Sequence, residues 1–240
     1  MKKLLAATCT LALMGTAATA ATVTFETDEA DFVAVGSVGG TQTGGAPQGP
    51  FLVSGVGSFT VDADTFSIDS GTTDGIGELV GSGTISLNGE GNIEITQNVE
   101  GIGIDNNNGF LGGDGSDVDG ANDNDIFVFS FDRQVRLVEV IFENVSGSDD
   151  FVFFVDGATP NATNFDIVNP LPGGPDTDGD EGSFGFGNQI VTTFGIGASG
   201  FNDNFRISRI EVTDVPLPAS ALLLLGGLGG LAAMRRRKKS

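Results

Sequence analysis

Short apolar runs, separated by glycine, asparagine and aspartate, are the feature that most limits how this chain can fold. The clearest run covers residues 126–131, where Phe127, Phe129 and Phe131 occupy every second position. Residues two apart share one face of an extended strand, so these three rings point to the same side of a sheet. All 19 phenylalanines of the chain lie within residues 21–214. This pattern predicts an all-β fold for that region.

The same pattern predicts about ten short strands in residues 21–214. They are expected at 22–25, 59–61, 66–68, 85–87, 93–95, 102–104, 126–131, 135–142, 151–155, 190–194 and 205–212. The strand at 135–142 is apolar on both faces, which places it at the centre of a sheet. The expected architecture is a two-layer antiparallel β-sandwich of the jelly-roll kind.

Three local features are predicted between these strands. A short helix is expected at 26–35, with Thr27 as its N-cap. A loop is expected at 36–50, because that stretch is rich in glycine and contains two prolines. Asn88–Gly89 favours a tight hairpin turn between the strands on either side of it.

Residues 21–214 are strongly acidic. They contain all 32 acidic residues of the chain and only four basic ones, Arg133, Arg136, Arg206 and Arg209, which gives a formal net charge of −28. Such a charge argues against binding to nucleic acid or to anionic lipid, and it favours solubility and cation binding. Adaptation to a salty medium, where repulsion between like charges is screened, explains the same composition.

Residue types that several kinds of catalysis require are missing. The chain has no histidine, and its single cysteine, Cys9, lies within the first 20 residues. This excludes Ser-His-Asp and Cys-His catalysis in residues 21–214 and removes the typical ligands of zinc. A pair of carboxylates, as in glycoside hydrolases, stays open as a third reading. The sequence therefore predicts a protein that is not an enzyme.

The first 20 residues are predicted to be a signal peptide. Lys2 and Lys3 form a charged start, and an apolar run at 4–14 follows. The small residues before the predicted cleavage point, between Ala20 and Ala21, fit the usual small-x-small pattern. The mature chain is then expected to begin at Ala21 and to contain no cysteine, so it has no disulfide although it is exported.

The C-terminal segment 215–240 combines a short motif, an apolar run and a basic end. The motif is Val215, Pro216, Leu217, Pro218 and Ala219, and the basic end comprises Arg235, Arg236, Arg237, Lys238 and Lys239. The apolar run at 221–234 is shorter than the roughly 20 residues that span a bilayer, so we expect a marginal membrane helix that is held at least transiently. The basic end is expected to stay in the cytoplasm.

This tail resembles the PEP-CTERM class of bacterial sorting signals, in its Val-Pro-Leu-Pro-Ala (VPLPA) variant. The resemblance implies export in a Gram-negative bacterium and recognition by an exosortase, a membrane-embedded enzyme that removes the tail. It also implies delivery to the cell surface or to an exopolysaccharide matrix. The alternative is a permanent C-terminal anchor in the inner membrane.

Two acidic loops are candidate calcium sites. The first spans 105–125 and the second 176–181; their candidate ligands are Asp114, Asp117, Asp119, Asp123 and Asp125, and Asp176, Asp178 and Asp180. Calcium takes six to eight oxygen ligands, and closely spaced aspartates can supply several of them. Neither loop has the spacing of an EF-hand, and solvent-exposed turns use the same residue types. Calcium is therefore a hypothesis that rests on the density of ligands.

The sequence divides into three parts: a signal peptide (1–20), an acidic β-domain (21–214) and a sorting signal (215–240). The function predicted from it is that of an exported, non-enzymatic protein of the cell surface or matrix. The alternative is a calcium-assisted, lectin-like module that binds carbohydrate. Residues 21–214 contain no tryptophan or tyrosine, the rings that usually stack on sugars, so such a module would have to bind sugar through calcium.

Overall fold

A computed structural model of the chain describes residues 20–25, 42–43, 48–74, 78–89, 93–105, 117–120, 124–146, 149–155, 161–167, 181–200 and 203–215. The chain divides into two compact units, and every described residue lies in the unit Thr19–Val215. The other unit combines residues 1–18 and 216–240 and lies outside the described residues. The predicted signal peptide, sorting signal and domain boundaries therefore stay predictions.

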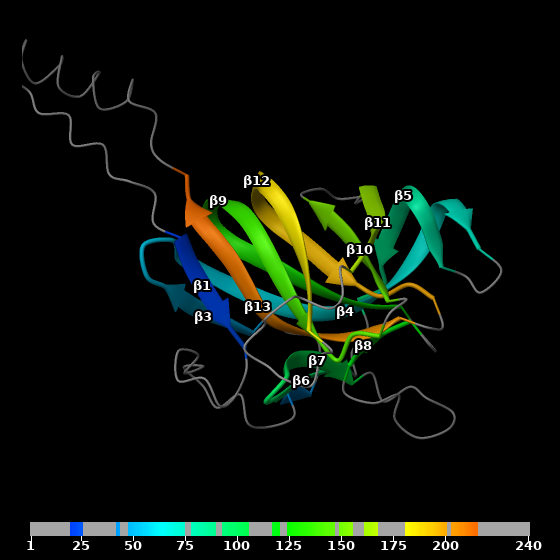
Figure 1. The fold of residues 1–240 in the computed structure, drawn as a ribbon, viewed down its shortest axis with the longest axis horizontal. Helices are drawn as coiled ribbons and strands as arrows, with labels where there is room; N and C mark the ends of the chain where they lie inside the picture. The colour runs from blue at the N-terminus through cyan, green and yellow to red at the C-terminus, as the bar shows by residue number, and fades with distance from the viewer. Residues whose placement is uncertain are drawn as a thin grey trace, which may run out of the picture. The chain divides into compact units, whose positions relative to one another are not determined.

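The described residues form thirteen strands and no helix (Figure 1). The strands are β1 (Ala20–Thr24), β2 (Gln42–Thr43), β3 (Gln48–Val53), β4 (Gly57–Thr73), β5 (Leu79–Leu87), β6 (Glu94–Asn98), β7 (Gly101–Asp105), β8 (Val118–Asp119), β9 (Asn124–Glu143), β10 (Asp150–Val155), β11 (Asn161–Asp166), β12 (Gly182–Gly197) and β13 (Asn204–Asp214). Every pairing among them is antiparallel, which confirms the all-β prediction for this part of the chain. Within these ranges, no helix has the length and apolar character that crossing a membrane requires.

Strand β9 is the centre of the described fold. It pairs with β12 from residue 126 to residue 142. On its other edge, the first half of β9 pairs with β4 and the second half pairs with β13. The strands predicted at 126–131 and 135–142 are therefore two halves of one strand. The exposed polar residues 132–134 interrupt the apolar pattern between them, but the backbone stays extended.

Six of the strands close into a ring. In order around the ring they are β4, β5, β11, β10, β12 and β9, and β9 pairs again with β4. These strands contribute the smaller of two apolar clusters, which contains Phe66, Ile68, Leu79, Ile85, Ile126, Val128, Val152, Phe154 and Ala162. Gly195 of β12 leaves room for the Phe154 ring of this cluster, because a Cβ at residue 195 would lie 2.1 Å from Cε1 of Phe154. The ring thus has a core of its own.

The larger apolar cluster lies on the opposite face of β9. Phe127, Phe129 and Phe131 all belong to it, so the prediction that they share one face is confirmed. The ring of Phe129 stacks on Phe194 with 4.9 Å between centroids, and Phe131 stacks on Phe59 at 5.5 Å. Stacked aromatic pairs add to the stabilisation that burial alone gives. Each face of β9 packs against one of the two apolar clusters, so the strand is buried on both sides.

The hairpin predicted at Asn88–Gly89 is wrong. Strands β5 and β6 on either side do not pair with each other: β5 pairs with β4 and β11, and β6 pairs with β2 and β7. The backbone N–H of Asn88 donates instead to the carbonyl of Thr65, at 2.9 Å. The N–H of Gly89 donates to a carboxylate oxygen of Asp64, also at 2.9 Å. The turn residues are thus fastened to β4.

Other differences follow from weak or interrupted patterns. The loop predicted at 36–50 is wrong where β2 and the start of β3 occupy it, and the helix predicted at 26–35 lies outside the described residues. The separate strands at 59–61 and 66–68 are parts of the single strand β4. The sequence did not predict β11, which is polar, or the glycine-rich first half of β12.

Candidate functional site

Three of the eight predicted calcium ligands are described: Asp117, Asp119 and Asp125. They lie around β8 and the start of β9, and β8 pairs with the first residues of β13. The other five, Asp114, Asp123, Asp176, Asp178 and Asp180, lie outside the described residues. The calcium prediction for the two loops therefore stays a prediction.

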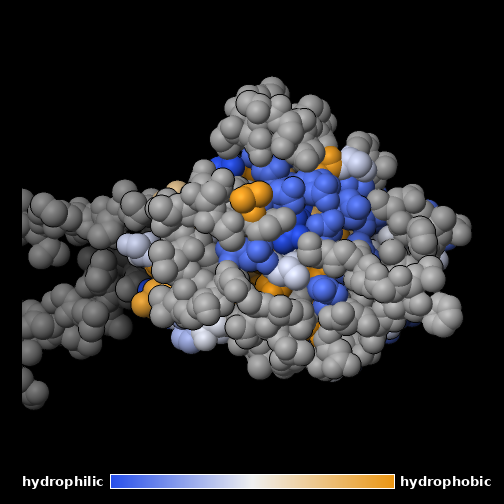
Figure 2. Space-filling view, turned by 90° about the horizontal axis from the view of Figure 1, so that it is seen from below, coloured by the Kyte–Doolittle hydropathy of each residue, from blue (hydrophilic) through white to orange (hydrophobic). Residues whose placement is uncertain are grey.

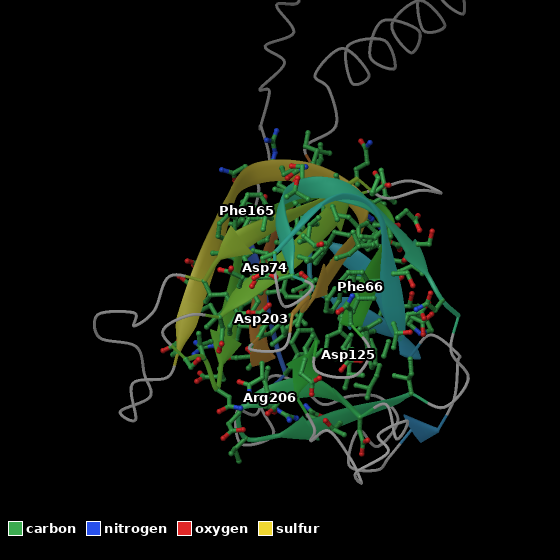
Figure 3. All side chains as sticks on the ribbon, turned by 90° about the vertical axis from the view of Figure 1, so that its right-hand side faces the viewer. Phe66, Asp74, Asp125, Phe165, Asp203 and Arg206 are labelled. Carbon is green, nitrogen blue, oxygen red and sulfur yellow. The ribbon has the colours of Figure 1, made fainter. Side chains whose placement is uncertain are left out.

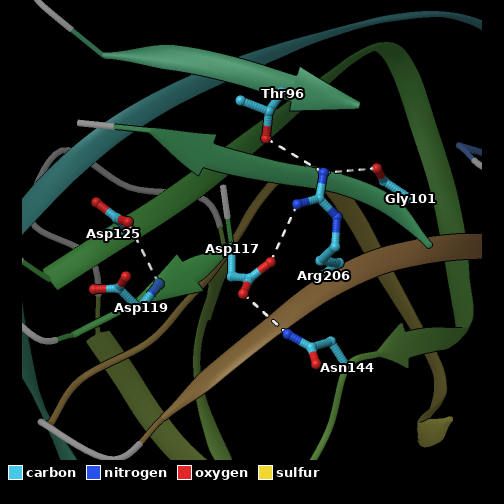
Figure 4. Close-up of polar contacts among 7 residues, drawn as sticks. All are labelled: Thr96, Gly101, Asp117, Asp119, Asp125, Asn144 and Arg206. Carbon is cyan, nitrogen blue, oxygen red and sulfur yellow. Dashed lines mark hydrogen bonds and ion pairs between the residues drawn. The ribbon is translucent and has the colours of Figure 1, made fainter. Parts of the chain in front are cut away.

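Asp117 contacts a buried guanidinium (Figure 4). Nη1 of Arg206 donates to Oδ1 of Asp117 at 3.1 Å, and Nδ2 of Asn144 donates to the other carboxylate oxygen at 2.9 Å. Nη2 of Arg206 donates to the carbonyl of Gly101 at 3.1 Å and to Oγ1 of Thr96 at 3.3 Å. Arg206 is fully buried, and one side chain thus links β13 to β6, β7 and the residue before β8.

Burial lowers the pKa of the Arg206 guanidinium below its usual range, and the hydrogen bond and charge of Asp117 oppose that shift. The ordinary pKa of arginine is so high that the side chain stays protonated in proteins. The buried positive charge therefore needs a negative partner, and Asp117 supplies it. Asp117, a predicted calcium ligand, therefore has a structural role. Both of its carboxylate oxygens already accept hydrogen bonds, one from Arg206 and one from Asn144.

Asp119 and Asp125 lie next to each other in the buried part of the same region. The backbone N–H of Asp119 donates to Oδ2 of Asp125 at 3.4 Å (Figure 4). Both side chains are buried. The N–H of Ala198 donates to the backbone carbonyl of Asp125 at 3.0 Å, so the end of β12 is fixed to this corner. In the described part of the chain, no three acidic side chains form a group that could hold a metal.

Asp203, which the sequence did not single out, lies directly before β13 (Figure 3), and other acidic residues lie near it. Asp203 is only 2% exposed. Its Oδ1 accepts a hydrogen bond from the backbone N–H of Asp150, at 3.1 Å. Its Oδ2 is buried and has no hydrogen-bond partner. Burial, together with the nearby charges of Glu78, Asp150 and Asp149, raises the pKa of Asp203 to about 8, and the hydrogen bond from Asp150 opposes this rise.

Asp149 is also buried but its oxygens are engaged. They accept hydrogen bonds from the N–H of Ser146 at 2.6 Å and from the Ser146 hydroxyl at 2.8 Å. Burial raises the pKa of Asp149, and these hydrogen bonds oppose the rise. The sequence carries a weak signal for this arrangement, because a serine three residues before an aspartate is a common local hydrogen-bonding pattern. It carries none for the approach of Asp203, which lies 53 residues beyond Asp150.

The described residues that are visible in Figure 2 are mainly hydrophilic, with isolated apolar side chains among them. The large apolar residues that are exposed are Leu52, Val80, Leu87, Val99 and Ile190. They come from three strands and one turn, so the described residues offer no obvious continuous apolar face.

The chain was compared with known proteins in three ways. No protein-family model, no curated protein and no solved structure matches it.

Proposed function

We propose that this protein is an exported, non-enzymatic protein of the cell surface or exopolysaccharide matrix, processed by an exosortase at its C-terminal tail. The proposal rests on the resemblance of residues 215–240 to a PEP-CTERM sorting signal of the VPLPA variant and on the signal-peptide pattern of residues 1–20. The folded unit is then the cargo, and residues 221–234 hold it in the membrane until it is processed.

The pairing of β1 with β13 is the structural observation that supports this proposal best. Ala21 is opposite Val212, and the pairing continues to Thr24 opposite Arg209. Strand β13 ends at Asp214, directly before the Val215 motif. Ala21, the predicted start of the mature chain, and Asp214, the last residue before the predicted motif, therefore lie at the same end of one strand pair. Cleavage at both signals would leave the pairs from Ala21 onwards intact.

We include a two-layer, jelly-roll-like sandwich in the proposal. The larger apolar cluster on one face of β9 supports it, because a sandwich needs apolar side chains between its layers. A sandwich of this kind suits a rigid surface module whose ends are free for processing.

The test is to express the full-length protein in a host with an active exosortase, beside a variant with Pro216→Ala and Pro218→Ala. Both changes lie after β13 and leave the folded unit unaltered. We expect the parent protein in the surface or secreted fraction without its tail, and the variant in the inner membrane at full length. Equal fractions and equal full-length masses for the two proteins would refute the proposed processing.

A further inference from the structure

We propose that the corner where β5, β10 and β13 begin binds a divalent cation of the calcium type, with Asp203 as its central ligand. The corner consists of Glu78, Asp149, Asp150, Gly200 and Asp203. None of them belongs to the two loops predicted from the sequence.

The first argument is the unpartnered oxygen of Asp203. Its Oδ2 is buried and accepts no hydrogen bond, while Oδ1 accepts one from Asp150. A buried polar atom without a partner is costly, and buried oxygens in native proteins are nearly always satisfied by protein, water or an ion. A bound cation would satisfy this oxygen directly.

The second argument is the sign of the neighbouring charges. The charges that raise the pKa of Asp203 belong to Glu78, Asp150 and Asp149, which come from the segments before β5 and at the start of β10. All three are acidic. The guanidinium nearest in sequence, Arg206, is bonded to Asp117, Thr96 and Gly101. The negative charges of the three acidic neighbours disfavour the ionised form of Asp203, and a bound divalent cation would offset this effect.

The third argument is that Glu78 and Asp203 converge beside Gly200. A Cβ at Gly200 would lie 2.8 Å from Cβ of Glu78 and 3.4 Å from Oδ2 of Asp203. The unpartnered oxygen of Asp203 and the side chain of Glu78 therefore pack against the same glycine and lie close to each other. Gly200 also has a φ of +118°, a conformation that other residues rarely adopt.

The ligand types favour calcium. All the candidate side-chain ligands are carboxylates, which bind hard cations. No three described acidic side chains form a ready-made metal group, so backbone carbonyls and water would complete the shell. Calcium accepts such mixed shells of six to eight oxygens, whereas magnesium requires a tighter octahedron and zinc prefers nitrogen and sulfur.

The test is the thermal unfolding of the full-length, chelator-treated protein by calorimetry at pH 9, with and without calcium chloride. We expect saturating calcium to raise the Tm by about 5–10 °C, as for a ligand at about 100 times its Kd in a domain of this size. Asp203→Asn should lose most of that rise and bind about one calcium ion fewer in equilibrium dialysis. Asp132→Asn, which removes an exposed acid elsewhere on β9, should keep both.

Glu78→Gln serves as a second variant if Asp203→Asn does not fold, and the same loss of calcium response is expected. A calcium response and stoichiometry equal to those of the parent in either folded variant would overturn the proposal. The absence of any Tm rise in the parent would do the same. If magnesium raises the Tm as much as calcium does, and Asp203→Asn keeps that rise, the effect is general screening of acidic charge. That result would also overturn the proposal. These results are independent of whether the C-terminal tail is processed.

Discussion

Asp117 and Asp203 lie close to the starts of the paired strands β8 and β13, yet their surroundings are opposite. Asp117 bonds to a buried guanidinium and to an amide. Asp203 has one backbone donor, an unpartnered oxygen and three acidic neighbours. Residues 21–214 contain 32 acidic but only four basic side chains, so arginine can compensate few of the acids. A buried carboxylate oxygen with neither an arginine nor a hydrogen-bond donor beside it favours protonation of the acid or binding of a cation.

The largest effect that follows from this comparison is expected at Arg206. Replacing Arg206 with methionine leaves Asp117 without its cation and removes the donors to Gly101 and Thr96. Breaking a buried ion pair by removing one partner costs about 3–5 kcal/mol of unfolding free energy. Urea unfolding followed by far-UV circular dichroism measures it, because the chain has no tryptophan or tyrosine to report by fluorescence.

The matched control is Arg133→Met. Arg133 is exposed and pairs with the exposed Asp132 at 3.3 Å, so its loss should cost less than about 1 kcal/mol. Losses of similar size for the two arginines would contradict the structural role assigned to Arg206.

A smaller loss is expected for Asp117→Asn. The amide keeps the shape of the carboxylate but removes the charge that faces Arg206. Arg206 keeps its hydrogen bonds to Thr96 and Gly101 and the nearby charge of Glu100, so the loss is reduced to about 1.5–3 kcal/mol, the contribution of a hydrogen bond to a charged group. The same urea unfolding measurement should therefore show a loss of that order. Combining Asp117→Asn with Arg206→Met should cost less than the sum of the two single changes, because the side chains share one interaction.

The smallest expected effect, and one of opposite sign, is that of Asp203→Asn. At pH 9 without calcium the parent must carry a buried, unpartnered negative charge at this position, whereas the amide is neutral. We therefore expect a net gain of about 1–2 kcal/mol in unfolding free energy, less than the full pKa shift implies, because the buried amide also lacks a partner at the Oδ2 position. A loss comparable to that of Asp117→Asn would show that the two acids do not differ in the way proposed.

The pH profile gives the same comparison a second readout. The pKa of Asp203 is about 8 in the folded protein and near 3.8 when exposed, so between these values only the folded state holds the proton. Stability then falls as pH rises through this range. The raised pKa of Asp149 acts in the same direction. Calorimetry from pH 5 to pH 9 should show a steeper fall for the parent than for Asp203→Asn.

Sequence reasoning recovered the strands that alternate strongly and missed the contacts between distant ones. The alternation of Phe127, Phe129 and Phe131 was enough to place a buried strand. The polar residues 132–134 concealed its continuation, since a central strand can cross exposed positions that no local pattern marks as extended. Asn88–Gly89 has the composition of a hairpin turn, but tertiary hydrogen bonds to β4 decide where it lies.

The candidate site was harder to predict than the fold. The dense aspartates around Asp117 attracted attention, yet Asp117 is bonded to Arg206, which lies 89 residues further along the chain. Asp203 stands in a short polar segment with no distinctive spacing, and its surroundings come from segments far apart in sequence. Burial and unpartnered atoms are properties of the fold, so no local pattern could indicate them.

The central claim is that one folded unit is exported and then released from a tail that begins after β13. The most direct test is the intact mass of the protein from cell-surface and secreted fractions of its natural host. The account predicts a chain that starts at Ala21 and ends near Pro218, with or without an added group. A chain that extends through Ser240 would contradict it and would establish an ordinary membrane anchor instead.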